Sequence, residues 1–339
     1  MTQKTTIRDV AKYAGVSVAT VSYVINGVNK VSDETKQRVL QAIQDLQYQP
    51  NFTAVSLSTN KSNMFGILIP LVEDTLAPVF AGNQYYSELI SGIEYVSRKS
   101  GYDFLISGAS NPNECRNWVT KRNLDGLLFL GSFPEKLYEE MKTLHTKIVL
   151  VDAYEEYSRL YHNIRMDDEL GGYLAAHHLA ERGHSRIAFV APGINNPIDR
   201  RRFLGFENAL KEHHISVNPE WIFLSGDGAF QSGYNVGMRL MQSEATAAFA
   251  TSDILALGMI KAIHEHNKEV PHDYSIVGFD DLIISQYSSP SLTTVRQDVF
   301  NKGAIAAQTL IDTVESKQPQ AQTVTLPVEL AVRDSTHFL

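Results

Sequence analysis

The chain has 339 residues and a single cysteine, Cys115, so it cannot form an intramolecular disulfide. No stretch approaches the ~18 consecutive apolar residues of a membrane-spanning helix, and the first residues lack the apolar core of a secretory signal. A protein with these absences is expected in the reducing cytoplasm, with no membrane as a partner.

The motifs of common enzyme and metal sites are also missing. There is no glycine-rich phosphate loop, no HExxH, no GxSxG and no cysteine cluster with zinc spacing. Neighbouring histidines at 177–178 and 213–214 fall on expected helices, where adjacent side chains diverge. We therefore expect no catalytic residue, no metal and no cofactor.

Basic residues are scarce except at the N-terminus. Residues 1–61 hold seven Lys/Arg and four Asp/Glu, a net charge of +3, so residues 62–339 carry −11 of the total of −8. A basic N-terminal segment on an acidic chain is typical of a nucleic-acid contact confined to that segment.

That segment has the start and stop signals of three short helices. Thr6 followed by Asp9 resembles a capping box, Gly15 ends the first helix, and Ser17 and Ser32 are good N-caps for the next two. Two short helices around a tight turn, followed by a third, are typical of a DNA-binding helix-turn-helix. Periodicity alone would fit a small packing domain equally well, but the exposed face of the second helix carries no acidic residue. We expect the inward residues to be Val10, Ala11, Ala14, Val21, Val24, Ile25, Val39, Leu40, Ile43 and Leu46.

From residue 62 onward, short apolar runs alternate with amphipathic segments. This alternation predicts parallel sheets covered by helices on both faces, and the length favours two such lobes. The apolar runs lie at 65–69, 102–106, 126–130, 147–151, 186–191, 247–250 and 275–279, and the helical patterns at 87–100, 169–182, 201–213, 254–266 and 300–316.

Polar residues follow several of the predicted strands. Asp152 follows KIVLV, Ser252 follows AAFAT and Asp280 follows SIVGF. Ligands of open α/β sheets bind outside the carboxyl ends of the strands, so these side chains are candidates for a binding site. For Asp253 and Asp281, which come next, we favour the simpler role of helix N-cap.

The chain resembles the lac repressor family of bacterial transcription regulators. The resemblance begins with TIRDVAKYAGVSVATVSYVIN and KVSDETKQRVLQAIQDLQYQPN, and continues through HLAERGHSRIAFVA, RFLGF, SIVGFDDLIISQYSSPSLTTVRQD and LPVELAVRDST. It implies an α/β fold with a three-helix headpiece at 1–50, a hinge at 51–61, and two doubly wound lobes of periplasmic-binding-protein type at 62–339. The implied N-lobe is 62–166 with 298–326, and the C-lobe is 167–297 with 327–339.

The resemblance also implies which residues contact DNA. Val18, Ala19 and Tyr23 are expected at base edges, and Thr20 and Asn26 at phosphates. The family often has Arg where Tyr23 stands, and Tyr cannot form the two hydrogen bonds of Arg with guanine, so the operator sequence cannot be transferred. In the hinge, Leu57 matches the leucine that wedges into the minor groove. The implied DNA-contacting residues are Thr6, Ser17, Val18, Ala19, Thr20, Ser22, Tyr23, Asn26, Asn51, Ala54 and Leu57.

An effector is expected in the cleft between the lobes. The loop at 71–87 is about nine residues longer than is usual in the family, which a surface loop tolerates, and it offers aromatic residues for one wall. Gly228 stands where some sugar-binding members have an aromatic residue, which Phe230 could replace. The expected effector contacts are Phe80, Asn83, Tyr85, Tyr86, Asp152, Arg202, Phe230, Ser252, Asp280 and Gln297.

These features together predict a repressor that binds a pseudo-palindromic operator in double-stranded DNA as a homodimer. We expect control by a small molecule, preferably a sugar or a sugar phosphate. A nucleobase, a nucleoside or a protein corepressor remains an alternative, and a solute-binding protein is a more distant one because it would have no use for a headpiece.

Overall fold

The computed structural model describes residues 5–25, 28, 30–48, 61–71, 84–109, 111–144, 146–154, 156–316 and 320–339. It divides into two units, one of residues 1–64 with 122–125, and one of residues 65–121 with 126–339. Among the described helices, none has both the length and the hydropathy needed to cross a bilayer.

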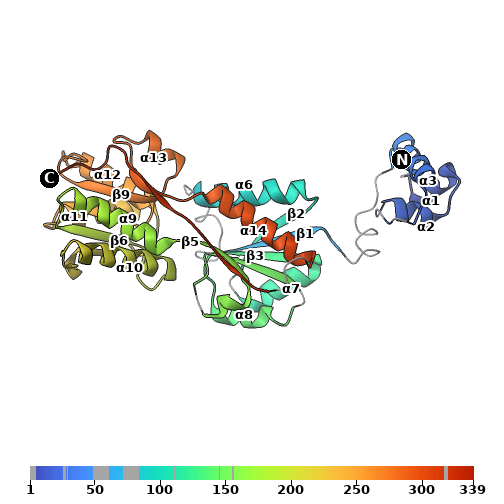
Figure 1. Ribbon diagram of the computed structural model, residues 1–339, viewed down its shortest axis with the longest axis horizontal. Coiled ribbons are helices and arrows are strands. Elements are labelled where there is room, and N and C mark those ends of the chain that lie inside the picture. The colour runs from blue at the N-terminus through green and yellow to red at the C-terminus, as the bar shows by residue number, and fades with distance from the viewer. Residues whose placement is uncertain are drawn as a thin grey trace. The chain divides into compact units, whose positions relative to one another are not determined.

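Among its described residues, the first unit has three helices (Figure 1): α1 (Ile7–Ala14), α2 (Val18–Ile25) and α3 (Asp33–Asp45). Asp9 accepts hydrogen bonds from the backbone N–H and the hydroxyl of Thr6, at 2.8 and 2.7 Å, and Gly15 ends α1 with φ of 66°. The Ser17 hydroxyl accepts from the Thr20 N–H at 3.1 Å at the start of α2. The three predicted helices are therefore confirmed, and their boundaries are set by the caps that the sequence displays.

The core of this unit is small and aliphatic. Val10, Val21 and Val39 are fully buried at the point where the three helices meet. The prediction for Leu40 was wrong, because its side chain is 48% exposed. Val39 already occupies the inward position on α3, and the next residue lies about 100° further round the helix.

The first of two six-stranded sheets has the strand order β11-β5-β4-β3-β1-β2, and the pairs from β11 to β1 are parallel. We call this sheet with its helices the N-lobe. Its strands are β1 (Met64–Pro70), β2 (Asp103–Ala109), β3 (Gly126–Leu130), β4 (Lys147–Val151), β5 (His162–Met166) and β11 (Thr323–Leu326), and its helices are α6 (Gln84–Lys99), α7 (Pro112–Arg122), α8 (Glu135–Met141), α14 (Val299–Val314) and the 3-10 helix η1 (Glu156–Leu160).

Helices cover both faces of this sheet. On one face α6 and α14 lie side by side, and their apolar residues pack on alternate residues of β1, β3, β4 and β5 (Figure 1). On the other face Phe129 packs against Tyr138 of α8, and Cys115 of α7 contacts Met141 of α8. Strands buried on both sides account for the continuous apolar runs seen in the sequence.

The second sheet has the order β12-β10-β9-β8-β6-β7, with only the β10–β12 pair antiparallel among the described pairs. We call it, with its helices, the C-lobe. Its strands are β6 (Ile187–Ala191), β7 (Ile222–Leu224), β8 (Ala247–Ala250), β9 (Ser275–Asp280), β10 (Thr293–Arg296) and β12 (Glu329–Ala331), and its helices are α9 (Asp168–Glu181), α10 (Pro197–Glu212), α11 (Phe230–Leu240), α12 (Asp253–Glu265), α13 (Ile283–Tyr287) and the 3-10 helix η2 (Pro219–Trp221).

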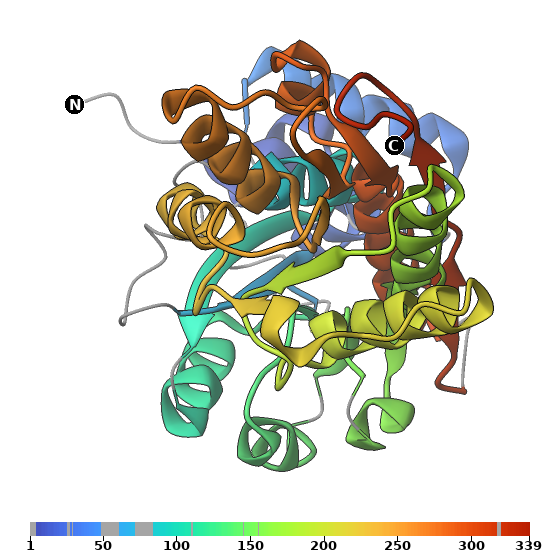
Figure 2. The ribbon, with the colours of Figure 1, turned by 90° about the vertical axis from the view of Figure 1, so that its left-hand side faces the viewer.

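This sheet is also covered on both faces (Figure 2). Helices α9 and α10 pack on one face through a cluster containing Phe189, Phe206 and Phe249, and α11 and α12 pack on the other face through aliphatic residues. Alternate residues of β6, β8 and β9 belong to the two clusters. The predicted α/β class with two parallel, doubly covered sheets is therefore confirmed.

The chain passes from one sheet to the other three times, after β5, after β10 and after β11. In both sheets the first two strands are ordered 2-1 and the rest follow in sequence, so each sheet has a switch point beside its first strand. Ligands of open α/β sheets bind at such switch points, outside the carboxyl ends of the strands.

Candidate functional site

A cavity of about 200 Å³ lies where the carboxyl ends of the strands of both lobes meet. The N-lobe lines it from α6 and from the ends of β3 and β4, and the C-lobe lines it from α10 and from the ends of β6, β8 and β9. Its lining residues are Tyr85, Tyr86, Leu89, Leu130, Gly131, Asp152, Pro192, Asn196, Ile198, Asp199, Arg202, Gly228, Thr251, Ser252, Ile254, Asp280 and Gln297.

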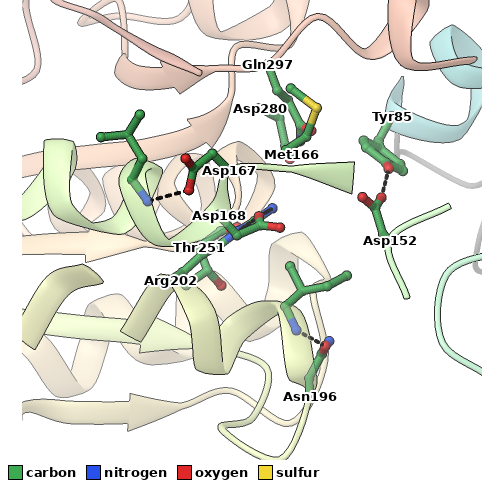
Figure 3. Close-up of polar contacts among 12 residues, drawn as sticks. Tyr85, Asp152, Met166, Asp167, Asp168, Asn196, Arg202, Thr251, Asp280 and Gln297 are labelled. Carbon is green, nitrogen blue, oxygen red and sulfur yellow. Dashed lines mark hydrogen bonds and ion pairs between the residues drawn. The ribbon is translucent and has the colours of Figure 1, made fainter. Parts of the chain in front are cut away.

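Arg202 of α10 forms part of the C-lobe wall and is 8% exposed. Its Nε donates to Oδ1 of Asp168 at 2.8 Å, and its Nη1 donates to the carbonyl oxygen of Thr251 at 2.5 Å (Figure 3). Its Nη2 also lies 2.8 Å from Asp168 Oδ1, and the guanidinium carbon stands 3.5 Å from the centre of the Phe279 ring. Burial lowers the pKa of Arg202, but Asp168 and nearby carboxylates outweigh this effect and raise it overall. Two of the five guanidinium N–H groups have no acceptor among the described residues and remain for a ligand.

Asp152 forms the opposite wall, directly after β4, with φ of 59°. Tyr85 donates its hydroxyl to Asp152 Oδ2 at 2.6 Å, and in Figure 3 the tyrosine points at this carboxylate. Burial, followed by the charge of Asp152, raises the pKa of Tyr85 well above its ordinary value, and the same two causes raise that of Tyr86 to about 12. Both tyrosines therefore stay protonated and can act as hydrogen-bond donors.

Behind Asp152 lies a buried lysine. Lys302 of α14 is 1% exposed, and its Nζ stands 3.0 and 2.8 Å from the two carboxylate oxygens of Asp152 and 2.9 Å from the Tyr85 hydroxyl. This ammonium thus has three acceptors for its three N–H groups.

Two further carboxylates face the cavity. Gln297 donates its amide to Asp280 Oδ1 at 2.5 Å, and no described residue pairs with Oε1 of Gln297 or with Oδ2 of Asp199. Burial raises the pKa of Asp199, and it raises that of Asp280 to about 6, in each case against the opposing effect of Arg202. The cavity therefore presents hydrogen-bond acceptors that have no donor among the described residues.

The charges around the cavity do not balance. Arg202 is paired with Asp168 and Lys302 with Asp152, whereas neither Asp199 nor Asp280 forms an ion pair with a cation among the described residues. Four carboxylates against two cations leave a net charge of about −2 if all are ionised, so the field inside the cavity opposes anions.

Seven of the ten effector contacts expected from the sequence line this one cavity. Ser252 does so while capping α12, since its hydroxyl accepts from the Leu255 N–H at 3.3 Å. Phe230, the first residue of α11, is 44% exposed and is not among the lining residues. Phe80 and Asn83 lie outside the described residues. The seven are Tyr85, Tyr86, Asp152, Arg202, Ser252, Asp280 and Gln297.

The structure corrects two simpler assignments. Asp253 is fully buried and accepts from the Leu282 N–H and from the hydroxyls of Ser285 and Thr294, so it joins three segments of the C-lobe. Asp281 pairs with Arg296 and Arg333, each at 2.5 Å. Neither side chain is a helix N-cap; Ser252 and Leu282 hold those positions.

Sequence reasoning missed Asp168, Asp199 and Lys302. The expected helix at 201–213 began four residues too late, which left Asp199 in a loop, whereas α10 begins at Pro197. The helix expected at 87–100 begins at Gln84, so Tyr85 lies in its first turn. Lys302 carried a usable signal, because it is a charged residue among the inward positions of α14, near Val299 and Ala306.

On α2 the expected DNA-contacting side chains are exposed or half-buried. Val18 is 41% exposed and Tyr23 is 39% exposed, and the Lys30 ammonium lies 5.8 Å from the centre of the Tyr23 ring. Ser17 and Ala19 are exposed, Thr20 and Ser22 are half-buried, and Thr6 is exposed at the start of α1. The expected contacts Asn26, Asn51, Ala54 and Leu57 lie outside the described residues.

Comparisons with known proteins agree with this architecture. Residues 6–51 match the family model "Bacterial regulatory proteins, lacI family", and residues 176–336 match "Periplasmic binding protein-like domain". The HTH-type transcriptional repressor PurR of Mannheimia succiniciproducens is 33% identical over 347 residues, covering 97% of this chain and 98% of that protein.

Two solved structures are similar over most of the chain. The lac repressor dimer bound to operator and the anti-inducer ONPF has a TM-score of 0.84 at 26% identity, covering 99% of this chain and all of that one. A LacI family regulator from Enterococcus faecium with bound ribose has a TM-score of 0.71 at 30% identity, covering 81% of this chain and 99% of that one. The chain belongs to the lacI family of bacterial regulatory proteins, as a DNA-binding transcription repressor and not an enzyme.

Proposed function

We propose that this repressor is controlled by an uncharged, hydroxyl-rich small molecule, a sugar without a phosphate group, held in the cavity between the lobes. The observation that carries the proposal is the surplus of acceptors there, namely Asp199, Asp280 and the Gln297 carbonyl oxygen. Hydroxyl groups can donate to these acceptors, and a ligand without donors would leave them unpaired. The ribose in the Enterococcus faecium relative supports the same ligand class.

The rest of the proposed mechanism follows the family layout. Two copies present their α2 helices to a pseudo-palindromic operator, because one helix-turn-helix supplies little contact for specific binding. We propose Val18, Ala19 and Tyr23 as base contacts and Thr20 and Asn26 as phosphate contacts. The proposed domains are the headpiece at 1–50, the hinge at 51–61 and the two lobes at 62–339, divided as the sequence predicts.

Effector binding is proposed to act through the three crossings between the lobes. A ligand that contacts Asp152 on one lobe and Arg202 or Asp280 on the other has different contacts in open and closed arrangements. The ligand therefore shifts the equilibrium between the open and closed arrangements of the lobes. Through the hinge, this shift changes the affinity for the operator.

The test combines thermal stability with operator binding. Ribose, cellobiose, ribose 5-phosphate, hypoxanthine and guanosine are compared for their effect on the melting temperature and then on operator affinity. We expect a free sugar to stabilise the protein and to change operator affinity. D280A should abolish both effects of the sugar and leave the operator affinity of the ligand-free protein unchanged. The control D103N, at an exposed position of the edge strand β2, should leave both effects of the sugar as in wild type.

Other outcomes would replace the proposed ligand. A response only to ribose 5-phosphate would contradict the charge argument, and a response to hypoxanthine or guanosine would assign the cavity to a base. If operator affinity responds to none of the five compounds, a protein corepressor becomes the better explanation.

A further inference from the structure

Behind the Asp152 wall of the cavity lies a charged residue that the family resemblance did not indicate, Lys302. Lys302 lies on the inward face of α14, whose other inward residues, such as Val299 and Ala306, are apolar. It does not line the cavity; it lies behind Asp152 and Tyr85, which do. Burying an ammonium group is unfavourable unless it is paired and hydrogen-bonded, so a lysine in this position needs a specific role.

The contacts of Lys302 define what that role can be. All three of its N–H groups have acceptors, two on Asp152 and one on Tyr85. The cation is therefore fully engaged and has no N–H left for a ligand. Asp152, in contrast, uses three of its four acceptor sites for the described residues, two on Oδ2 and one on Oδ1. The pair thus turns an acceptor toward the cavity and keeps the positive charge behind it.

We propose that Lys302 is a specificity-determining residue that, by holding Asp152 and Tyr85, makes this wall accept ligand hydroxyl groups and reject anions. The inference rests on the proposed effector cavity, but not on which sugar occupies it. A phosphate at this wall would meet the Asp152 carboxylate before it met the ammonium. Removal of the Asp152 charge weakens this selectivity, because it takes away one of the four carboxylates that oppose anions and leaves the Lys302 ammonium behind the wall without its counter-charge.

The experiment measures the binding of inorganic phosphate, used as the anionic probe, to the full-length protein. Melting temperature and binding heat are measured in sodium phosphate and in sodium chloride of equal ionic strength. Wild type should show no phosphate-specific effect at the cavity. D152N should bind phosphate at least about tenfold more tightly than wild type, because the positive charge of Lys302 behind the wall is then unbalanced. D152N/K302M, in which both charges are absent, should lose that gain.

The charge-swapped variant D152K/K302D protects the test against a folding failure of D152N. It keeps an oppositely charged pair in the wall but places the cation on the cavity side, so it too should gain phosphate binding. A merely structural role for Lys302 predicts lower stability in D152N and no change in anion preference.

Each outcome decides the question. The assignment would be overturned by phosphate binding in the cavity of wild type. It would also be overturned if D152N and the swapped variant gained no phosphate affinity, or if D152N/K302M gained as much as D152N. These readouts do not depend on operator binding. The proposed sugar effector could therefore prove wrong while the role of Lys302 stands, and the role of Lys302 could prove wrong while the sugar effector stands.

Discussion

The buried pair between Arg202 and Asp168 offers a sharp test of the energetics, because an exposed pair lies beside it. Asp168 and Glu169 are consecutive in α9, and their partners Arg202 and Arg201 are consecutive in α10. The side chains of the first pair are 10% and 2% exposed, and those of the second are 46% and 43% exposed. The two pairs thus differ chiefly in their access to water.

The substitution D168N removes one charge and keeps the shape of the side chain. It leaves the Arg202 guanidinium buried without its main counter-charge and weakens the acceptor for the Tyr154 hydroxyl. Breaking a buried ion pair costs about 3–5 kcal/mol, so we expect a loss of this size in the free energy of unfolding of the C-lobe. The control E169Q breaks the exposed pair and should cost at most about 1 kcal/mol.

The assay uses the two tryptophans of the chain, Trp118 on α7 of the N-lobe and Trp221 in η2 of the C-lobe. In a W118F background Trp221 is the sole tryptophan, so its fluorescence during urea unfolding follows the C-lobe. If D168N and E169Q lower the unfolding midpoint equally, burial does not determine the strength of these pairs and the reasoning fails.

Three further predictions concern the hinge, the operator and the cavity. L57A, in the segment outside the described residues, should weaken operator binding far more than non-specific DNA binding in a titration at fixed salt; equal losses would remove Leu57 from the minor groove. Y23R should change the preferred base at one operator position by about 1–3 kcal/mol, as selection from a random library would reveal, and an unchanged motif would mean that Tyr23 points elsewhere. Because burial raises the pKa of Asp280 from 3.8 to about 6 in the folded protein, the ligand-free protein should lose stability as pH rises from about 4 to 7, relative to D280N. The full loss is roughly 3 kcal/mol, and parallel pH profiles for the two proteins in urea titrations would contradict it.

The parts of the fold that were predictable from the sequence depend on local signals. The ends of the headpiece helices are set by capping contacts between residues that are only a few positions apart, so the sequence itself displays both partners. The capping residues are Thr6, Gly15, Ser17 and Ser32. The central strands were visible because they are buried on both faces. Strands β7 and β12, with three residues each, are too short to show any periodicity.

The parts that were missed depend on distant partners. Lys302 and Asp152 are 150 residues apart, and Arg202 and Asp168 are 34 apart. Nothing in the neighbourhood of Asp253 indicates that its acceptors would serve hydroxyls more than 30 residues away. The polar strand ends could be placed at the cavity from the general rule for α/β sheets, but the pairing of charges behind them required the structure.

The three crossings have a consequence for synthesis of the chain on the ribosome. Helix α14 and strand β11 belong to the N-lobe, but α14 begins 133 residues after the end of β5 and β11 follows later still. The residues between β5 and α14 take roughly 7–27 s to translate. Throughout that interval Val149, Val151 and Ile164 lack the helix that covers them in the finished protein. The nascent chain therefore presents an open apolar surface while the second sheet is being made, and this is the stage at which chaperones and slow translation should matter most for its yield.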